Sequence, residues 1–205
     1  MLSMNHLTIT REMRDAIQLK AKGYPIFAKR GGGAIRISFY PFCKEADDWL
    51  GGLGQYMDMM NRFNGKLFQR HNSPCYEFVF GITPGKGMVI TDVWDNEWQQ
   101  VSCYGYSALK IAHAYRAAYE GKGYCSGIDL GIPYLVEENG YAAHPGALGF
   151  IIKYKGSFFF DIAVCVSGAT PEEDKECAAA AIRVVEDLFA NEKDFAVVFP
   201  NLSAK

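Results

Sequence analysis

The residue whose type and position are best suited to chemistry is His144, in the segment Tyr141-Ala142-Ala143-His144-Pro145-Gly146-Ala147. The Pro-Gly pair predicts a tight turn, and loops held by a rigid scaffold are where proteins commonly present functional side chains. Imidazole changes its charge near neutral pH and binds metals, so His144 is a candidate ligand or proton-transfer group. The same ring could instead hydrogen-bond a backbone carbonyl of the turn, and the sequence leaves both interpretations open.

The other histidines and the cysteines give weaker patterns. His6, His71 and His113 are not spaced as zinc ligands. His113 lies off the apolar stripe of its predicted helix, which favours a position in solvent or at an interface over a role as a ligand. Cys165 lies in a predicted strand without a cationic neighbour in sequence, so we expect a small buried hydrophobe rather than a nucleophile.

Two further segments resemble binding motifs only in part. A polar cluster around Trp94 and Trp98 consists of Asp92, Asp95, Asn96 and Glu97. It could supply oxygen ligands to a cation, but it lacks the glycine and the terminal glutamate of a calcium loop. We expect it to begin a helix or to contact another subunit. The segment 81–87 has the wrong glycine spacing for a phosphate-binding loop and predicts a hairpin turn.

The pair Ser167-Gly168 connects a predicted strand to a predicted helix. Glycine permits a sharp exit from the strand, and Ser167 or Thr170 can cap the helix. Free amides at the start of that helix could hold an anionic group. A capped strand-to-helix connection explains the same residues without a ligand.

Hydrophobic periodicity predicts the elements that must position these groups. Thr170-Pro171-Glu172-Glu173 begins the clearest helix, and Lys155-Gly156-Ser157 joins two apolar strands as a hairpin. The predicted helices cover residues 171–190, 44–61, 107–119 and a weaker range from Thr8 or Thr10 to 22. The predicted strands are 34–40, 76–82, 88–93, 148–154 and 158–166. This order indicates a single α+β domain, residues 1–205, with a mainly antiparallel sheet.

Composition narrows the class of protein. The chain has 205 residues, of which 49% are hydrophobic and 21% charged, and its formal net charge is -2. The charge balance disfavours nucleic acid and anionic membrane as partners. The six cysteines show no C-x-x-C spacing and the first residues show no signal peptide, so we expect a reduced cytoplasmic protein with no membrane span. The 14% aromatic content favours an oligomer interface or a pocket for a flat ligand.

Three segments together resemble a known family. Asp95-Asn96-Glu97-Trp98, the range 141–148 and the range 166–174 are similar to the signatures of an uncharacterised branch of the GlcG/HbpS-like superfamily, the haem-degrading-domain family. The likeness covers residues 35–190, which leaves 1–34 as an N-terminal extension. Gln99-Gln100-Val101 departs from the basic residue that this branch carries after its tryptophan, and Tyr106-Ser107 departs from its Ser-Ser pair.

The resemblance implies a three-layer α/β/α sandwich with a five-stranded, mainly antiparallel sheet, assembled into a homo-oligomer. Some relatives bind haem or corrinoids, which implies a ligand-binding protein with haem as the leading cofactor and His144 as its axial ligand, followed by His113 and His71. The implied ligand-binding residues are His144, Gly146, Ser167, Gly168, Trp98, Asn96 and His113. A fungal relative associates with a protein-targeting complex, so the alternative is a non-enzymatic adaptor that docks other proteins. Whether the chain is an enzyme stays open.

Overall fold

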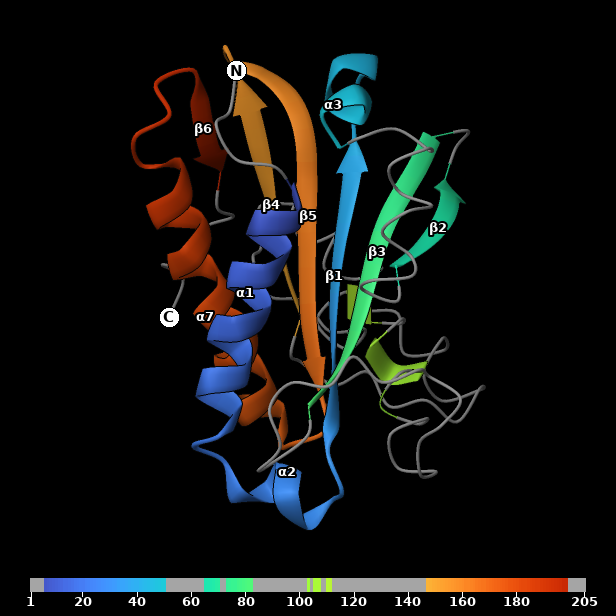
Figure 1. Ribbon diagram of the computed structural model, residues 1–205, viewed down its shortest axis with the longest axis vertical. Helices are drawn as coiled ribbons and strands as arrows, with labels where there is room; N and C mark the ends of the chain where they lie inside the picture. Colours follow the sequence, from blue (N-terminus) through green and yellow to red (C-terminus); the bar gives the residue numbers. More distant parts are fainter. Residues whose placement is uncertain are drawn as a thin grey trace, which may run out of the picture.

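The structure is a computed structural model that describes residues 6–50, 65–70, 73–82, 103, 105–107, 110–111 and 147–198. One antiparallel sheet organises them, with the strand order β2-β3-β1-β5-β4-β6 (Figure 1). The strands are β1 (Gly33–Pro41), β2 (Gly65–Arg70), β3 (Ser73–Ile82), β4 (Ala147–Tyr154), β5 (Ser157–Ser167) and β6 (Phe195–Val198). The helices are α1 (His6–Ala21), α2 (Pro25–Lys29), α3 (Lys44–Trp49) and α7 (Pro171–Phe189). The predicted α+β class with a mainly antiparallel sheet is confirmed.

Helices α1 and α7 lie side by side over one face of the sheet (Figure 1). Because side chains alternate along a strand, every second residue over 35–39 of β1 and 160–166 of β5 points at these helices, and these residues are fully buried. The core between the layers contains Ile35, Ile37, Phe39, Ile162, Val164, Val166, Ile9, Met13, Ile17, Cys177, Ala181 and Val185. The N-terminal residues that form α1 are thus part of the main core.

The opposite face of the sheet is more polar. The alternate positions of β1 place Arg36 and Ser38 there, and β5 contributes Asp161, Cys165 and Ser167, all of them buried. The helical residues at 103, 105–107 and 110–111 lie against this face, since the Ser107 side chain and backbone bond to Arg36 and Cys165. The full third layer stays a prediction, because most of the predicted helix 107–119 lies outside the described residues.

The β4–β5 hairpin and α7 form as their local sequences predict. Lys155 and Gly156 have φ angles of 48° and 82°, which is the pair of positive values that a tight type I′ hairpin turn needs. Thr170 accepts the Glu173 N–H, while the Glu173 carboxylate accepts the Thr170 N–H, so α7 begins with a complete capping box. Pro171 occupies the first turn.

Replacing Thr170 by alanine is expected to lower the free energy of unfolding by about 1 kcal/mol, because it removes the side-chain oxygen that accepts the Glu173 N–H. Thr170→Ser keeps that oxygen and is expected to stay close to the wild type. Urea unfolding followed by circular dichroism measures both. Equal unfolding midpoints for the alanine and serine variants would show that the cap contributes nothing.

Several elements differ from the sequence predictions. Strands β2 and β6, the two edge strands of the described sheet, and helix α2 were not predicted, whereas β1, β3, β4 and β5 correspond to four of the five predicted strands. Helix α3 begins at Lys44 as predicted, but residues 51–61 of the predicted helix lie outside the described part, as does the predicted strand 88–93. Among the described helices, none has the length and apolarity needed to cross a bilayer.

Candidate functional site

A cavity of about 250 Å³ lies at the amino end of α7. Its wall combines the β5–α7 connection, helical residues from the polar face of the sheet, and Arg30 from the segment after α2. The polar residues in this wall are Arg30, Tyr106, Lys110, Ser167, Thr170 and Asp174. Segments from three distant parts of the sequence therefore meet around one space.

Gly168 fixes the shape of the β5–α7 connection. Its φ angle is 143°, a conformation that L side chains rarely adopt, and a Cβ atom there would lie 2.7 Å from Gly33 Cα and 3.0 Å from the Gly32 carbonyl oxygen. A Cβ atom at Gly33 would in turn lie 2.7 Å from the Ser167 carbonyl oxygen. The two glycines let the start of β1 approach the end of β5 closely, and this contact sets where α7 begins.

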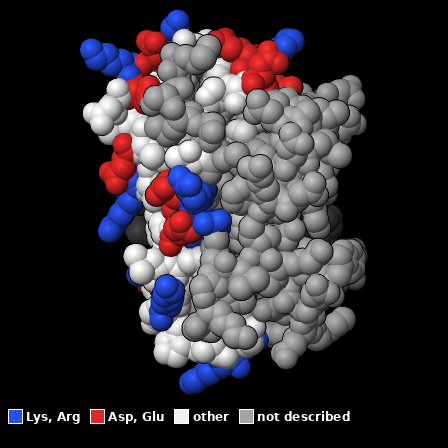
Figure 2. Space-filling view, viewed as in Figure 1, with Lys and Arg blue, Asp and Glu red and all other residues white. Residues whose placement is uncertain are grey.

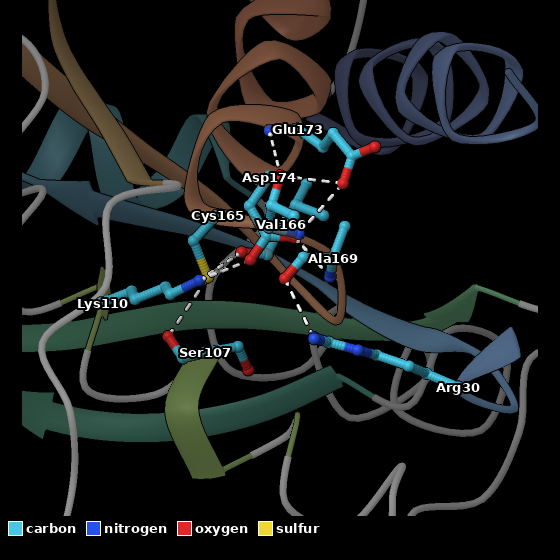
Figure 3. A network of polar contacts seen from close by, with 9 residues as sticks. Arg30, Ser107, Lys110, Cys165, Val166, Ala169, Glu173 and Asp174 are labelled. Carbon is cyan, nitrogen blue, oxygen red and sulfur yellow. Dashed lines mark hydrogen bonds and ion pairs between the residues drawn. The ribbon is translucent and has the colours of Figure 1, made fainter. Parts of the chain in front are cut away.

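A buried ion pair ties the connection to the polar face (Figure 3). Lys110 Nζ lies 2.9 Å from Asp174 Oδ2 and donates a second hydrogen bond, also 2.9 Å, to the Val166 carbonyl oxygen. Asp174 Oδ1 accepts the Ala169 N–H at 3.0 Å. Burial raises the pKa of Asp174, and the positive charge of Lys110 opposes that effect. The pair thus holds two points of the chain around the connection, the Val166 carbonyl through Lys110 and the Ala169 N–H through Asp174.

Cys165 lies beside this pair but is not a reactive thiol. Burial raises its pKa to about 12, and Sγ donates to the Ser107 carbonyl oxygen at 3.2 Å (Figure 3). The prediction of a buried cysteine is therefore confirmed. Further along the same face, Arg36 donates to Ser107 Oγ at 3.0 Å and forms a buried ion pair with Glu77.

Arg30 and Ser167 keep hydrogen-bonding capacity that the described residues do not use. The exposed Arg30 guanidinium donates one bond, from Nη1 to the Ala169 carbonyl oxygen at 3.2 Å, so most of its five N–H donors have no partner among the described residues. Ser167 is 5% exposed, and its hydroxyl makes no hydrogen bond within the described part of the chain. Strand alternation places that hydroxyl on the polar face with Cys165, toward the cavity.

Of the predicted ligand-binding residues, Ser167 and Gly168 line this cavity. The others, His144, Gly146, Trp98, Asn96 and His113, lie outside the described residues, as does His71, so their roles stay predictions. Within the described ranges, no three His, Cys, Asp or Glu side chains are grouped as metal ligands.

Arg30 and Lys110 line the cavity but were not predicted as site residues. For Lys110, the available signal is its position in a predicted helix, next to the buried Ile111 and one turn after the buried Ser107. A lysine so close to the inward side of a helix needs a buried partner. Arg30 stands just before the Gly31-Gly32-Gly33 turn and carries no comparable local signal.

Comparison with known proteins adds no family assignment. A scan against protein-family models, a search of curated proteins and a search of solved structures each find no match. The likeness to the haem-degrading-domain family therefore stays a prediction from three short segments. The function must be inferred from the geometry of the cavity.

Proposed function

We propose that the protein binds a small ligand with a carboxylate or phosphate group in the cavity at the amino end of α7. The observation that carries this proposal is a donor set in the cavity wall that the described residues leave largely unused: the guanidinium of Arg30 and the buried hydroxyl of Ser167. A planar guanidinium can donate two parallel hydrogen bonds to a carboxylate or phosphate, and a serine hydroxyl can donate a third.

The charges of the described wall support an anionic ligand. Lys110 and Asp174 offset each other as an ion pair, which leaves the positive charge of Arg30. The amino end of α7, a helix of 19 residues, adds the positive end of its macrodipole. The capping box already satisfies part of the helix terminus, so the ligand would depend mainly on the side chains of Arg30 and Ser167.

The size of the cavity favours a small acid. Pockets that hold cofactors and drug-sized ligands span about 300–1,000 Å³. The cavity, at about 250 Å³, is below this range. Its volume suits a short carboxylic acid or a phosphate better than a tetrapyrrole.

The test is a ligand titration followed by thermal unfolding and calorimetry. Acetate, succinate and inorganic phosphate are the probes, and acetamide and succinamide are uncharged controls of matched shape. A ligand at 100 times its Kd stabilises the folded state by about 2.7 kcal/mol, which raises the Tm by about 5–10 °C in a chain of this length. We expect a saturable rise with at least one anion and none with the amides.

Two variants test whether the binding occurs in this cavity. Arg30→Met is expected to weaken binding at least tenfold, because it removes the charged donor. Lys29→Met removes the same charge from the exposed neighbouring residue, which is not in the described cavity wall, and is expected to bind as the wild type does. Flat titrations with all three anions, or equal losses in both variants, would contradict the proposal.

The haem hypothesis rests on the family resemblance and on His144. It is supported by the high aromatic content of the chain. A haemin titration followed by absorption tests it separately, since a saturable Soret shift that His144→Ala removes would favour a tetrapyrrole. A flat haemin titration, together with a saturable anion titration, would exclude the tetrapyrrole and support only the small-acid proposal.

A further inference from the structure

The cavity at the amino end of α7 contains a third donor group besides Arg30 and Ser167, the ammonium of Lys110. Lys110 lines the cavity, and its side chain is 5% exposed. An ammonium has three N–H groups, and the described residues accept two of them, through the Val166 carbonyl oxygen and Asp174 Oδ2. One N–H of a buried cation in the cavity wall is therefore left without an acceptor among the described residues.

Arg30 and Lys110 reach the β5–α7 connection from opposite sides (Figure 3). Arg30 comes from the segment after α2 and donates to the Ala169 carbonyl oxygen. Lys110 comes from the helical residues on the polar face of the sheet, and its partner Asp174 accepts the Ala169 N–H. Ser167, on the same connection, lines the same cavity. A ligand in this cavity therefore meets donor groups on more than one side.

Carboxylate and phosphate groups differ in the directions that their oxygens face. The two oxygens of a carboxylate lie in one plane with their carbon, so a carboxylate that accepts two parallel bonds from a guanidinium turns both oxygens to that side. A phosphate monoester has three unsubstituted oxygens around a tetrahedral phosphorus. Two of them can accept bonds from Arg30, which leaves the third for Lys110 on the other side of the connection.

The charges of the described residues restrict this preference to the cavity. Asp174 is the acidic residue of the wall, and Lys110 offsets its charge, so the positive charge of Arg30 and the amino end of α7 act on the ligand. Acidic and basic side chains are interspersed on the described part of the face in Figure 2, which does not favour diffuse binding of anions there. Selectivity between anions must therefore come from the donors of the cavity wall.

We propose that the ligand of this cavity carries a phosphate group, free or as a small monoester, and that Lys110 selects it over a carboxylate by donating its third N–H to the third oxygen. This inference rests on the anion site proposed above and narrows the class of its ligand. Arg30 and Ser167 can bind an anion of either class. Lys110 is the residue that distinguishes the two classes.

Calorimetric titration of the wild-type protein at pH 7.5 tests the ligand class. Methyl phosphate and inorganic phosphate are the probes, and acetate, succinate and dimethyl phosphate are the controls. Succinate carries two negative charges on planar groups, whereas dimethyl phosphate keeps the tetrahedral phosphorus but has only two unsubstituted oxygens. A hydrogen bond from a charged donor accounts for about a tenfold change in Kd or more. We expect one of the two probes to bind about tenfold more tightly than every control.

The double variant Lys110→Met/Asp174→Leu tests the role of Lys110. It removes both charges of the buried pair, so the net charge of the described wall stays the same. Loss of the third N–H is expected to reduce the preference for the phosphate probe over acetate from about tenfold to near one. A purely structural role of the pair would weaken the binding of both ligands alike and leave their ratio unchanged.

Lys44→Met/Asp48→Leu is the matched control. It makes the same change at an exposed ion pair of 2.6 Å on α3, whose residues are not in the described cavity wall. This variant is expected to keep the wild-type Kd for the phosphate probe and for acetate. Circular dichroism establishes that each variant is folded, and the wild-type series decides the ligand class without any variant.

The outcomes separate this inference from the anion site on which it rests. Acetate or succinate bound as tightly as both phosphate probes would overturn the inference and leave the anion site intact, whereas no binding of any anion would overturn both. A folded double variant that keeps the wild-type preference would also overturn the inference. Tighter binding of methyl phosphate than of inorganic phosphate would support a monoester as the ligand, and the reverse order would support free phosphate.

Discussion

Lys110→Met is expected to lower the free energy of unfolding by about 3–5 kcal/mol, because removing one partner of a buried ion pair leaves the other charge without compensation. The side chains of Lys110 and Asp174 are 5% and 4% exposed. The lysine also donates to the Val166 carbonyl oxygen, so its loss removes two hydrogen bonds from the strand-to-helix connection. Asp174 keeps its bond from the Ala169 N–H but would lack the cation that stabilises its charged form.

Urea unfolding at pH 7 measures this loss of stability. Three further variants test whether it comes from the buried charge that is left unpaired. Asp174→Asn leaves Lys110 without its carboxylate and is expected to be destabilising to a similar degree. In the double variant Lys110→Met/Asp174→Leu no charge remains, so it should be clearly more stable than the sum of the single losses predicts. Lys175→Met, at the exposed neighbour of Asp174, should change stability by less than about 0.5 kcal/mol. Additive losses in the double variant would show that the two side chains are not coupled.

The parts of the fold that the sequence predicted are those with local signals. Helix α7 begins with a cap and proline, and the β4–β5 hairpin turns at a lysine and a glycine with positive φ angles. The missed strands lack such signals. Strand β2 reads Gly-Lys-Leu-Phe-Gln-Arg, with no clear alternation, and β6 has four residues that pair with β4 more than 40 positions earlier. Such strands form because they pair with neighbouring strands of the sheet, and a local sequence pattern does not identify those neighbours.

The same distinction applies to the cavity. Ser167 and Gly168 were recognisable because a glycine after a buried strand and before a helix cap is a local feature. The pairing of Lys110 with Asp174 joins residues 64 positions apart, and Arg30 reaches Ala169 across 139 positions. The Arg30 contact depends on the pairing of β1 with β5, and the Lys110 contact depends on the packing of its helical segment against the sheet, and no single segment encodes either.

The N-terminal residues show the limit of a motif comparison. Residues 1–34 lie outside the family-like region and were predicted as an extension that contains one weaker helix. Yet α1 places Ile9, Met13 and Ile17 in the main core at zero exposure. Their apolar positions fit a helical period, but the sequence does not reveal that α7 is the partner, because α7 begins 150 residues after α1 ends.

His6 gives α1 a pH-dependent attachment to the core. The imidazole is 2% exposed, and its ring centroid lies 6.1–6.3 Å from those of Phe39, Trp49 and Phe78. Burial lowers the pKa of His6 from its ordinary 6.5 to about 4. Between these two values the unfolded chain binds a proton that the folded chain does not bind, so the folded state loses stability as the pH falls. No stability is lost on this account above pH 6.5, and the loss amounts to about 3 kcal/mol by pH 4.

The His6→Phe variant separates this contribution from the carboxylates that also titrate in acid. A phenyl ring keeps the aromatic contacts and has no proton to bind, so the difference in unfolding free energy between variant and wild type isolates the imidazole. Urea unfolding at pH 7.5, 5.5 and 4.5 should show this difference moving in favour of the variant by up to about 1.4 kcal/mol for each pH unit below 6.5. If the difference stays constant across the three pH values, the pKa of His6 is the same in the folded and unfolded states. That result would show that the ring is not buried among Phe39, Trp49 and Phe78.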